Sequence, residues 1–225
     1  MKKCNKTAVN NPVEYHKNYR EKMGPTNKLL IASGNRGKLR EIRAILSDVP
    51  VNLLMPADLG LDLEVVEDGS TYAENAALKA RAYCDLSGII TMADDSGLEV
   101  DALNGQPGLY SARYSPKPGA TDADRRTYML ANLAGKERPW LAHFHCTIAI
   151  ALPGGEIYYA EGDCPGQIIP EEHGSAGFGY DPIFLLPEKG LTMAELAEEE
   201  KNRVSHRARA IVAALPVLKR LMNAV

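Results

Sequence analysis

The sequence predicts an α/β fold with a mixed β-sheet, because strand, helix and hairpin signals alternate along the chain. Residues 28–32 form an apolar run that breaks at a Ser-Gly-Asn turn and leads into an amphipathic helix. Residues 141–152 alternate in polarity, and Pro153-Gly154-Gly155 joins them to a second run over 156–161, which predicts a hairpin. A strand–loop–helix unit followed by a hairpin indicates that parallel and antiparallel strands share one sheet.

Local sequence signals predict where the helices and strands of the first half of the chain begin and end. Pro50 is expected to end the first helix, and residues 51–55 are typical of a second strand. Thr71 and Glu74 match the capping box that starts a helix, and this helix is expected to run to Gly88.

The second half of the chain continues the alternation. A buried strand over 89–93 is expected to end at Asp94, and a helix is expected from Thr121 to about Gly135. Residues 183–186 are expected to form a strand and residues 192–195 to open a helix. The last helix should be capped by Ser205, with Ala208, Ile211, Val212 and Leu215 on its inner side.

Composition limits the function. The chain has 225 residues and a formal net charge of -3, without the strongly basic domain typical of nucleic-acid-binding proteins. No apolar run approaches the roughly 18 residues that span a bilayer, and the N-terminus lacks a signal-peptide pattern. Four scattered cysteines without a CxxC pair predict free thiols. We expect a cytoplasmic protein without a membrane or stable nucleic-acid partner, with a flexible extension over 1–27 and one domain over 28–225.

Residues 33–38, Ser-Gly-Asn-Arg-Gly-Lys, join the first predicted strand to a helix. Free backbone N–H groups at a helix start bind anions, and Arg36 and Lys38 add positive charge. The spacing is not that of a Walker P-loop, because Gly34 and Gly37 lie too close together and no Ser or Thr follows the lysine. A plain helix start with exposed charges explains the pattern equally well.

The adjacent carboxylates Asp94 and Asp95 follow a buried strand, where ligands bind in open α/β sheets. Because like charges repel, such a pair is usually either solvated or bound to a cation. Glu67 and Glu74 add oxygen ligands of the type that magnesium prefers. The alternative interpretation is an ordinary Asp-Ser-Gly turn.

Two later segments carry side chains suited to a nucleotide. His206 and Arg207 follow Ser205 at a helix start, where cations face the positive end of the helix dipole, so an anion or a carbonyl is expected opposite them. In residues 177–182 an aromatic between glycines, Phe178, could stack on a base. The structural alternatives are exposed basic residues and a tight turn with an aromatic plug.

Two other arrangements are weaker candidates. His143 and His145 share one face of a strand but lack a third ligand nearby, so a packing or surface role is expected. Ser96 and Ser111 have no histidine–carboxylate partners in the sequence, which argues against a serine hydrolase triad.

In their order along the chain, the motifs resemble the inosine triphosphate pyrophosphatase family, also called the Ham1-like family. The resemblance covers about residues 28 to 223. It rests on Ser33-Gly34-Asn35-Arg36-Gly37-Lys38, Glu74-Asn75-Ala76, Ala93–Leu98, Pro107–Tyr114, Phe178–Pro182 and Ser205-His206-Arg207. The N-terminal extension departs from the family pattern, in which the first strand starts almost at the initiator methionine.

The resemblance implies an elongated, two-lobed fold with a long central mixed β-sheet flanked by helices, an active-site cleft between the lobes, and a homodimer. It implies a magnesium-dependent hydrolase that converts the non-standard purine nucleotides ITP, dITP and XTP to monophosphate and pyrophosphate. Glu67 and Asp95 would hold Mg²⁺, Asp95 would also accept a proton from water, and Lys38 would stabilise phosphate charge. The substrate would contact Ser33, Gly34, Asn35, Arg36, Gly37, Lys38, Ser96, Phe178, Gly179, Tyr180, Asp181, Lys201, His206 and Arg207.

Base selection has a physical basis in this hypothesis. Six-oxo purines present an acceptor where adenine presents a donor, so Arg207 or His206 at that edge would leave adenine mismatched. The phosphate-binding turn would leave the choice of base to the far end of the site. Two alternatives stay open, namely a house-cleaning pyrophosphatase for other modified nucleotides and a non-catalytic nucleotide-binding regulator. The presence of Lys38 and Asp95 argues against the second.

Overall fold

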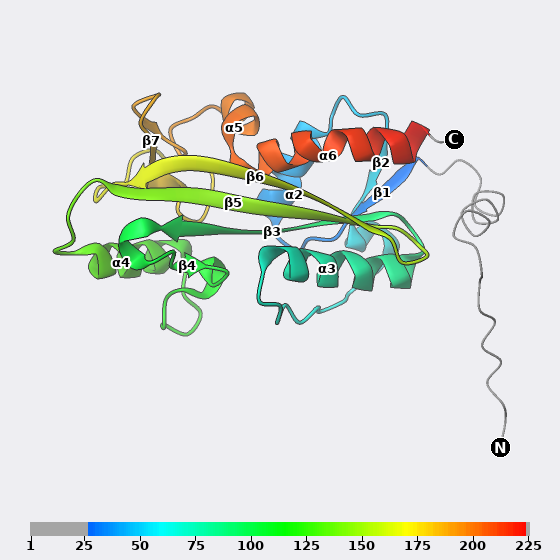
Figure 1. The fold of residues 1–225 in the computed structure, drawn as a ribbon, viewed down its shortest axis with the longest axis horizontal. Helices are drawn as coiled ribbons and strands as arrows, with labels where there is room; N and C mark the ends of the chain where they lie inside the picture. Colours follow the sequence, from blue (N-terminus) through cyan, green and yellow to red (C-terminus); the bar gives the residue numbers. More distant parts are fainter. Residues whose placement is uncertain (1–26, 224–225) are drawn as a thin grey trace, which may run out of the picture.

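The computed structural model describes residues 27–223 and confirms the predicted α/β class, with a mixed sheet at its centre (Figure 1). Its strands are β1 (Lys28–Ile31), β2 (Asn52–Leu54), β3 (Thr91–Val100), β4 (Pro107–Gly108), β5 (Trp140–Ala151), β6 (Ile157–Ile168), β7 (Phe184–Leu186) and β8 (Leu191–Thr192). They are ordered β2-β1-β3-β5-β6-β7-β8, and β4 pairs with β3. β1 is parallel to β2 and β3, whereas the other pairs are antiparallel.

Helices cover both faces of the sheet. They are α2 (Arg36–Ile45), α3 (Tyr72–Ser87), α4 (Asp122–Leu133), α5 (Glu198–Val204) and α6 (His206–Asn223). α2, α5 and α6 lie on one face, and α3 and α4 lie on the other (Figure 1). None of these helices is long and apolar enough to cross a membrane. The predicted extension over 1–27 falls, except for its last residue, outside the described part of the chain.

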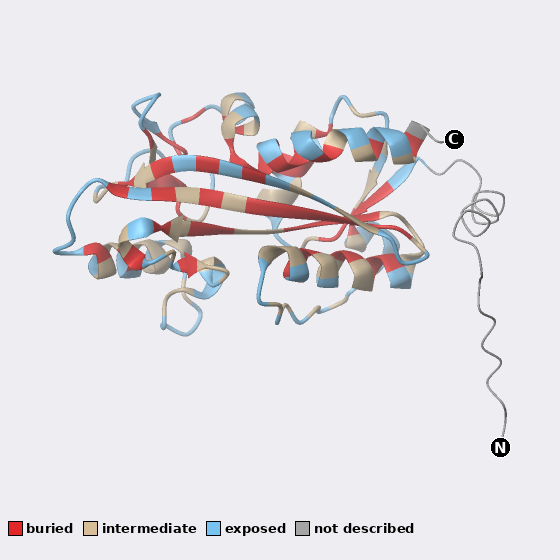
Figure 2. Ribbon diagram, viewed as in Figure 1, coloured by how far each residue is buried: buried red, intermediate tan, exposed pale blue. Residues whose placement is uncertain are grey.

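The buried residues, coloured red in Figure 2, form three clusters that belong to two lobes. One cluster joins α4 to the end of β3 and the start of β5, around Leu98, Met129 and Phe144. Two more clusters lie on opposite faces of β1, one under α2 and α6 and one under α3. The long strands β3, β5 and β6 run through both lobes, so the elongated shape implied by the family resemblance is present.

β3 does not end at Asp94, as the sequence predicted, but continues to Val100. The reason is its pairing with β5 along the whole length, with Asp95 opposite Thr147. On its other edge, β3 pairs with β1 only up to Met92 and with β4 only from Leu98. Within the described residues, positions 93–97 therefore lack a neighbouring strand on that edge, and the two acidic residues lie in this gap.

Two predictions about the C-terminal helices are wrong. Thr192 belongs to β8 and pairs with Leu185, so no helix opens there, although Thr192 N–H does donate to the Glu195 carboxylate at 2.8 Å as at a helix start. The next helix, α5, begins at Glu198. In α6, Ser205 caps the helix as expected, but Val212 is 58% exposed. The buried side of α6 instead includes Ala208, Ala210, Ile211, Ala214 and Leu218.

The predicted cap of α3 differs in one detail. The Thr71 hydroxyl accepts from Glu74 N–H at 3.1 Å, as the capping box requires. The Glu74 carboxylate, however, accepts from the backbone N–H of Ser70 at 2.6 Å and from its hydroxyl at 2.7 Å. Glu74 is therefore a capping residue of the loop before α3.

α6 packs directly on the backbone of β6 at Gly162. A Cβ at this position would lie 2.3 Å from Ala210 N and 2.5 Å from His206 O. Because both atoms belong to the backbone, Gly162→Ala must move the helix and should lower the free energy of unfolding by about 1–3 kcal/mol in urea denaturation. Gly34→Ala, whose Cβ would meet nothing within 4 Å, is the matched control. Equal stability of the two variants would contradict this packing.

Candidate active site

A cavity of about 450 Å³ lies at the gap in the β3 edge, between the two lobes. It brings together most of the residues predicted from the sequence. These are Ser33, Gly34, Asn35, Lys38, Glu67, Asp95, Ser96, Phe178, Gly179, Tyr180, Asp181, Lys201, His206 and Arg207. Two predicted residues, Arg36 and Gly37, do not line the cavity, and Arg36 lies in a separate surface groove with Arg40 and Arg43. Residues that the sequence reasoning did not single out also line it, among them Lys79, Asp122 and Phe144.

The turn between β1 and α2 presents a helix N-terminus to the cavity. Asn35 is the N-cap, and its side-chain oxygen accepts from Gly37 N–H at 2.9 Å and Lys38 N–H at 3.1 Å. The first turn of α2 contains no acidic residue. The positive end of the helix dipole, with Lys38 beside it, is therefore available to an anion.

Lys38 forms an ion pair with Asp94, with 2.9 Å between Lys38 Nζ and Asp94 Oδ2. Asp94 is only 2% exposed. Burial alone would raise the pKa of Asp94, but Lys38, Arg207 and Lys79 hold the pKa well below its usual range. Asp94 is therefore a buried anion that orients cationic side chains.

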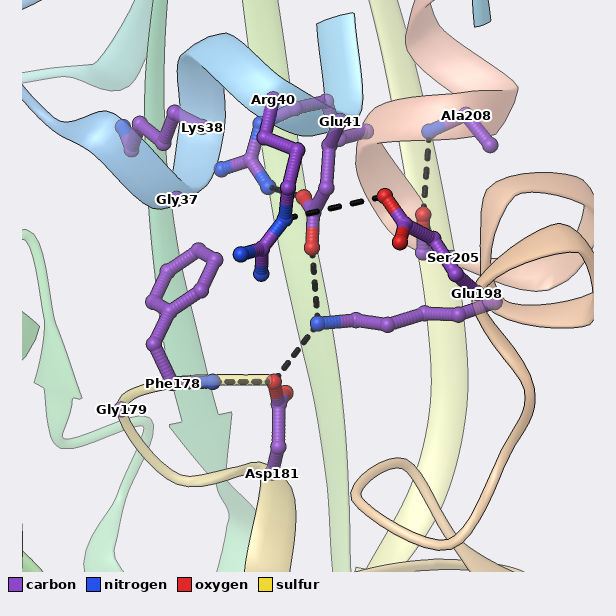
Figure 3. Close-up of polar contacts among 12 residues, drawn as sticks. Gly37, Lys38, Arg40, Glu41, Phe178, Gly179, Asp181, Glu198, Ser205 and Ala208 are labelled. Atoms are coloured by element: carbon purple, nitrogen blue, oxygen red, sulfur yellow. Dashed lines mark hydrogen bonds and ion pairs between the residues drawn. The ribbon is translucent and has the colours of Figure 1, made fainter. Parts of the chain in front are cut away.

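A chain of buried ion pairs continues from Asp94 across the site, and Figure 3 shows its part around Glu41 and Asp181. Arg207 is 1% exposed and donates to Asp94 through Nε and Nη2, both at 3.2 Å, and to Glu41 through Nη1. Lys201 Nζ lies 2.7 Å from Glu41 Oε1 and 2.6 Å from Asp181 Oδ2. The expectation that an anion faces Arg207 is confirmed, and the anions are protein carboxylates.

Sequence reasoning missed the role of Glu41. The available signal was its position on the inner side of α2, three residues after Lys38 and next to the buried Ile42. Its carboxylate binds both Lys201 and Arg207, so it connects α2 to the C-terminal part of the site.

Burial and neighbouring charges together shift the pKa values of the remaining buried groups. Burial raises the pKa of Asp181 despite the opposing charge of Lys201. The pKa of Lys201 is raised, because Asp181 and Glu41 outweigh the effect of burial. Burial, together with Arg207 and Lys201, places the pKa of His206 well below its usual value. His206 is therefore neutral, and its ring stacks on Phe144 with a centroid distance of 4.7 Å.

Asp95 and Glu67 face the same side of the cavity. Asp95 accepts hydrogen bonds from Asn75 Nδ2 at 3.2 Å and from Ser96 N–H at 3.0 Å. Burial raises the pKa of Asp95, while Lys38 and Lys79 oppose the shift. Lys79 Nζ lies 3.0 Å from Glu67 Oε1. The pair thus presents carboxylate oxygens to the cavity, with a lysine beside them.

This donor set suits a divalent cation that arrives with its ligand. Magnesium is commonly bound by one or two carboxylates together with substrate phosphates, and Glu67 and Asp95 provide the carboxylates. Among residues 27–223 no group of three His, Cys, Asp or Glu side chains surrounds a metal position. His143 contacts Glu99 at 3.4 Å and His145 contacts Asp163 at 2.7 Å, consistent with the predicted non-metal role.

Phe178 contacts the turn over residues 33–38 directly. A Cβ at Gly37 would lie 2.7 Å from Phe178 Cδ1. The ring centroid also lies 5.0 Å from Lys201 Nζ and 5.8 Å from Arg207 Cζ, within reach of a cation–π interaction. The expectation that the aromatic residue and the turn occupy opposite ends of the site is therefore wrong in this structure.

Comparisons with known proteins agree with this arrangement. The sequence profile of the Ham1 family matches residues 29–217. The chain is 48% identical over 186 residues to a protein of Geobacter sulfurreducens named dITP/XTP pyrophosphatase, covering 82% of this chain and 92% of that one. A Nostoc protein of the same name is 47% identical over 199 residues, covering 88% and 97% of the two chains.

Solved structures show the same similarity. The Ham1 protein of Staphylococcus aureus superimposes with a TM-score of 0.75 at 37% identity, covering 88% of this chain and 100% of that one. A nucleoside-triphosphatase / dITP/XTP pyrophosphatase of Mycobacterium abscessus gives a TM-score of 0.66 at 42% identity, covering 85% and 99%. The match over nearly the whole described chain shows that this protein belongs to the Ham1 family.

Proposed function

We propose that the protein is a nucleoside triphosphate pyrophosphohydrolase that converts dITP, XTP and ITP to monophosphate and pyrophosphate. The observation that carries this proposal is the joint position of a helix N-terminus with Lys38 and of the carboxylates Asp95 and Glu67 in one cavity. This arrangement supports phosphate recognition by the helix N-terminus and proton acceptance by a nearby carboxylate. The names of the relatives support the choice of substrates.

In this proposal the residues of the chain bind the triphosphate and activate water. The turn over residues 33–38 and Lys38 bind the phosphate oxygens. Asp95 accepts a proton from the water that attacks the α-phosphorus, and pyrophosphate leaves. Glu67 and Asp95 would hold Mg²⁺, which when bound neutralises phosphate charge.

The base would bind on the side of Phe178, with Ser96, Tyr180, Asp181 and Lys201 completing the substrate contacts. The Arg207 guanidinium is already bound to Asp94, Glu41 and Ser96. Of the two residues expected at the base edge, His206 is therefore the better candidate, since its Nδ1 has no partner among the described residues. A neutral imidazole that donates to a six-oxo group would leave adenine mismatched, at a cost of about 1–3 kcal/mol.

Pyrophosphate release from a nucleotide panel tests the proposal. With Mg²⁺, dITP and XTP should be hydrolysed with kcat/KM at least about tenfold above that for dATP. Chelation by EDTA should abolish release, and added Mg²⁺ should restore it. Higher kcat/KM for modified pyrimidine nucleotides would favour the other house-cleaning activity, and binding without turnover would favour a regulator.

The remaining features implied by the family resemblance are part of the same proposal. Residues 28–225 would act as one catalytic domain, and the protein would work as a homodimer in the cytoplasm. Light scattering after size-exclusion chromatography measures the oligomeric state, and a monomeric mass would contradict the dimer.

A further inference from the structure

The first turn of α4 holds the peptide next to Phe178. Gly179 N–H donates to Asp122 Oδ2 at 2.8 Å, and Gly179 C=O accepts from Arg126 Nη1 at 2.8 Å. Both polar groups of one backbone residue are therefore bound by one helical turn. Gly179 has φ +63°, a left-handed conformation that favours glycine, so the loop has a defined shape at this point.

The two side chains that bind Gly179 are themselves fixed. Arg126 makes a bidentate pair with Glu172, with Nε and Nη2 at 2.8 and 2.9 Å from the carboxylate oxygens. Asp122 also bonds to Arg125. Burial would raise the pKa of Asp122, but the bond from Gly179 N–H and the charge of Arg125 lower it below its usual value. Asp122 and Arg126, which we call the clamp residues, are thus charged and oriented.

Other contacts fix the neighbouring residues of the same loop. Phe178 N–H donates to Asp181 Oδ2 at 2.8 Å, and the Tyr180 hydroxyl donates to Ser111 C=O at 2.9 Å. From this fixed backbone the Phe178 side chain points toward Gly37, which belongs to the other lobe (Figure 3). Because the backbone is held on both sides of Phe178, the ring position depends on α4.

We propose that Asp122 and Arg126 are positioning residues for the nucleotide base. By binding Gly179, they set the place of the Phe178 ring, on which the base stacks. This inference rests on the proposed function, because it takes Phe178 as the base-stacking residue. Although Phe178 touches Gly37, Lys38 is held by Asp94 and not by Asp122 or Arg126. Loss of the bonds to Gly179 should therefore weaken recognition of the nucleoside more than binding of the phosphate chain at Lys38 and the N-terminus of α2.

Arg126→Ala and Asp122→Ala test the proposal in the full-length protein. Loss of these hydrogen bonds should raise KM for dITP about tenfold and change kcat less than about twofold. Inhibition by inorganic tripolyphosphate, which has no base, should keep the wild-type inhibition constant. Lys117→Ala is the matched control, because it also removes a cation that pairs with α4. Lys117 lies before the helix and forms an exposed ion pair with Asp124, at 2.7 Å. This control should leave both constants unchanged.

A double-mutant cycle shows whether the effect passes through Phe178. In a Phe178→Ala background, Arg126→Ala should raise KM no further. If Arg126 had only a general structural role, Arg126→Ala would raise KM by the same factor in both backgrounds. Arg126→Lys, which keeps the charge, should show a smaller rise in KM and serves if Arg126→Ala does not fold.

Three results would overturn the positioning role: unchanged KM in both folded single variants, an equal loss of tripolyphosphate inhibition, or full additivity with Phe178→Ala. Absence of pyrophosphate release by the wild-type protein would count against the proposed function alone. The same variants would then be compared by calorimetric binding of dIMP and tripolyphosphate, with the same pattern expected.

Discussion

Asp95→Asn should lower kcat for dITP by about 10²–10⁴-fold, the usual contribution of a general base. The amide keeps the size of the side chain and one acceptor for Ser96 N–H, so the fold should be retained. What is lost is the carboxylate that we propose takes the proton from the attacking water. Initial rates of pyrophosphate release at saturating dITP measure the effect.

Two comparisons make this result specific to Asp95. Glu99→Gln neutralises another carboxylate of β3, one that bonds to the Tyr72 hydroxyl at 3.0 Å, and should keep wild-type turnover. Raising the Mg²⁺ concentration separates the two proposed roles of Asp95, because recovery at high Mg²⁺ would assign the residue to metal binding alone. Wild-type turnover by Asp95→Asn would exclude both roles.

Arg207→Met should lower the free energy of unfolding by about 3–5 kcal/mol, because the buried carboxylates of Glu41 and Asp94 each lose one of their two cationic partners and the buried cluster gains a net negative charge. Glu41 and Asp94 are 3% and 2% exposed, so water cannot replace the guanidinium without rearrangement. Urea denaturation at neutral pH measures the loss. Arg209→Met, in the same helix but exposed, should cost no more than about 0.5 kcal/mol.

A second substitution tests the cause of this destabilisation. Adding Glu41→Gln to Arg207→Met removes the excess negative charge of the buried cluster and should recover part of the lost stability. If Arg207→Met were no less stable than Arg209→Met, the buried ion pairs would contribute nothing to folding.

The parts of the site that depend on local chemistry were predictable from the sequence. The turn before α2 follows from Asn35 as an N-cap, and the start of α6 follows from Ser205. The order of the motifs identified the family before any contact was known. Most predicted substrate-binding residues do line one cavity, although their individual roles remain predictions.

The failures share a physical cause, which is pairing with distant residues. Asp94 and Asp95 are poor strand formers, and only the register with β5, some fifty positions later, keeps them in β3. At Thr192 the local cap forms, but pairing with β7 determines the backbone. No local pattern indicates the roles of Glu41 and Arg126, because their partners lie far away in the sequence.

The ion pairs of Glu41 also constrain how the protein can be made. During synthesis, Glu41 leaves the ribosome long before Lys201 and Arg207, the two cations that bind its carboxylate. A nascent chain that has reached only β7 contains α2 but neither Lys201 nor Arg207 to neutralise that carboxylate. The lobe that contains α2 can therefore reach its final packing only after translation has passed the start of α6. The whole site depends on the last tenth of the chain to complete its folding.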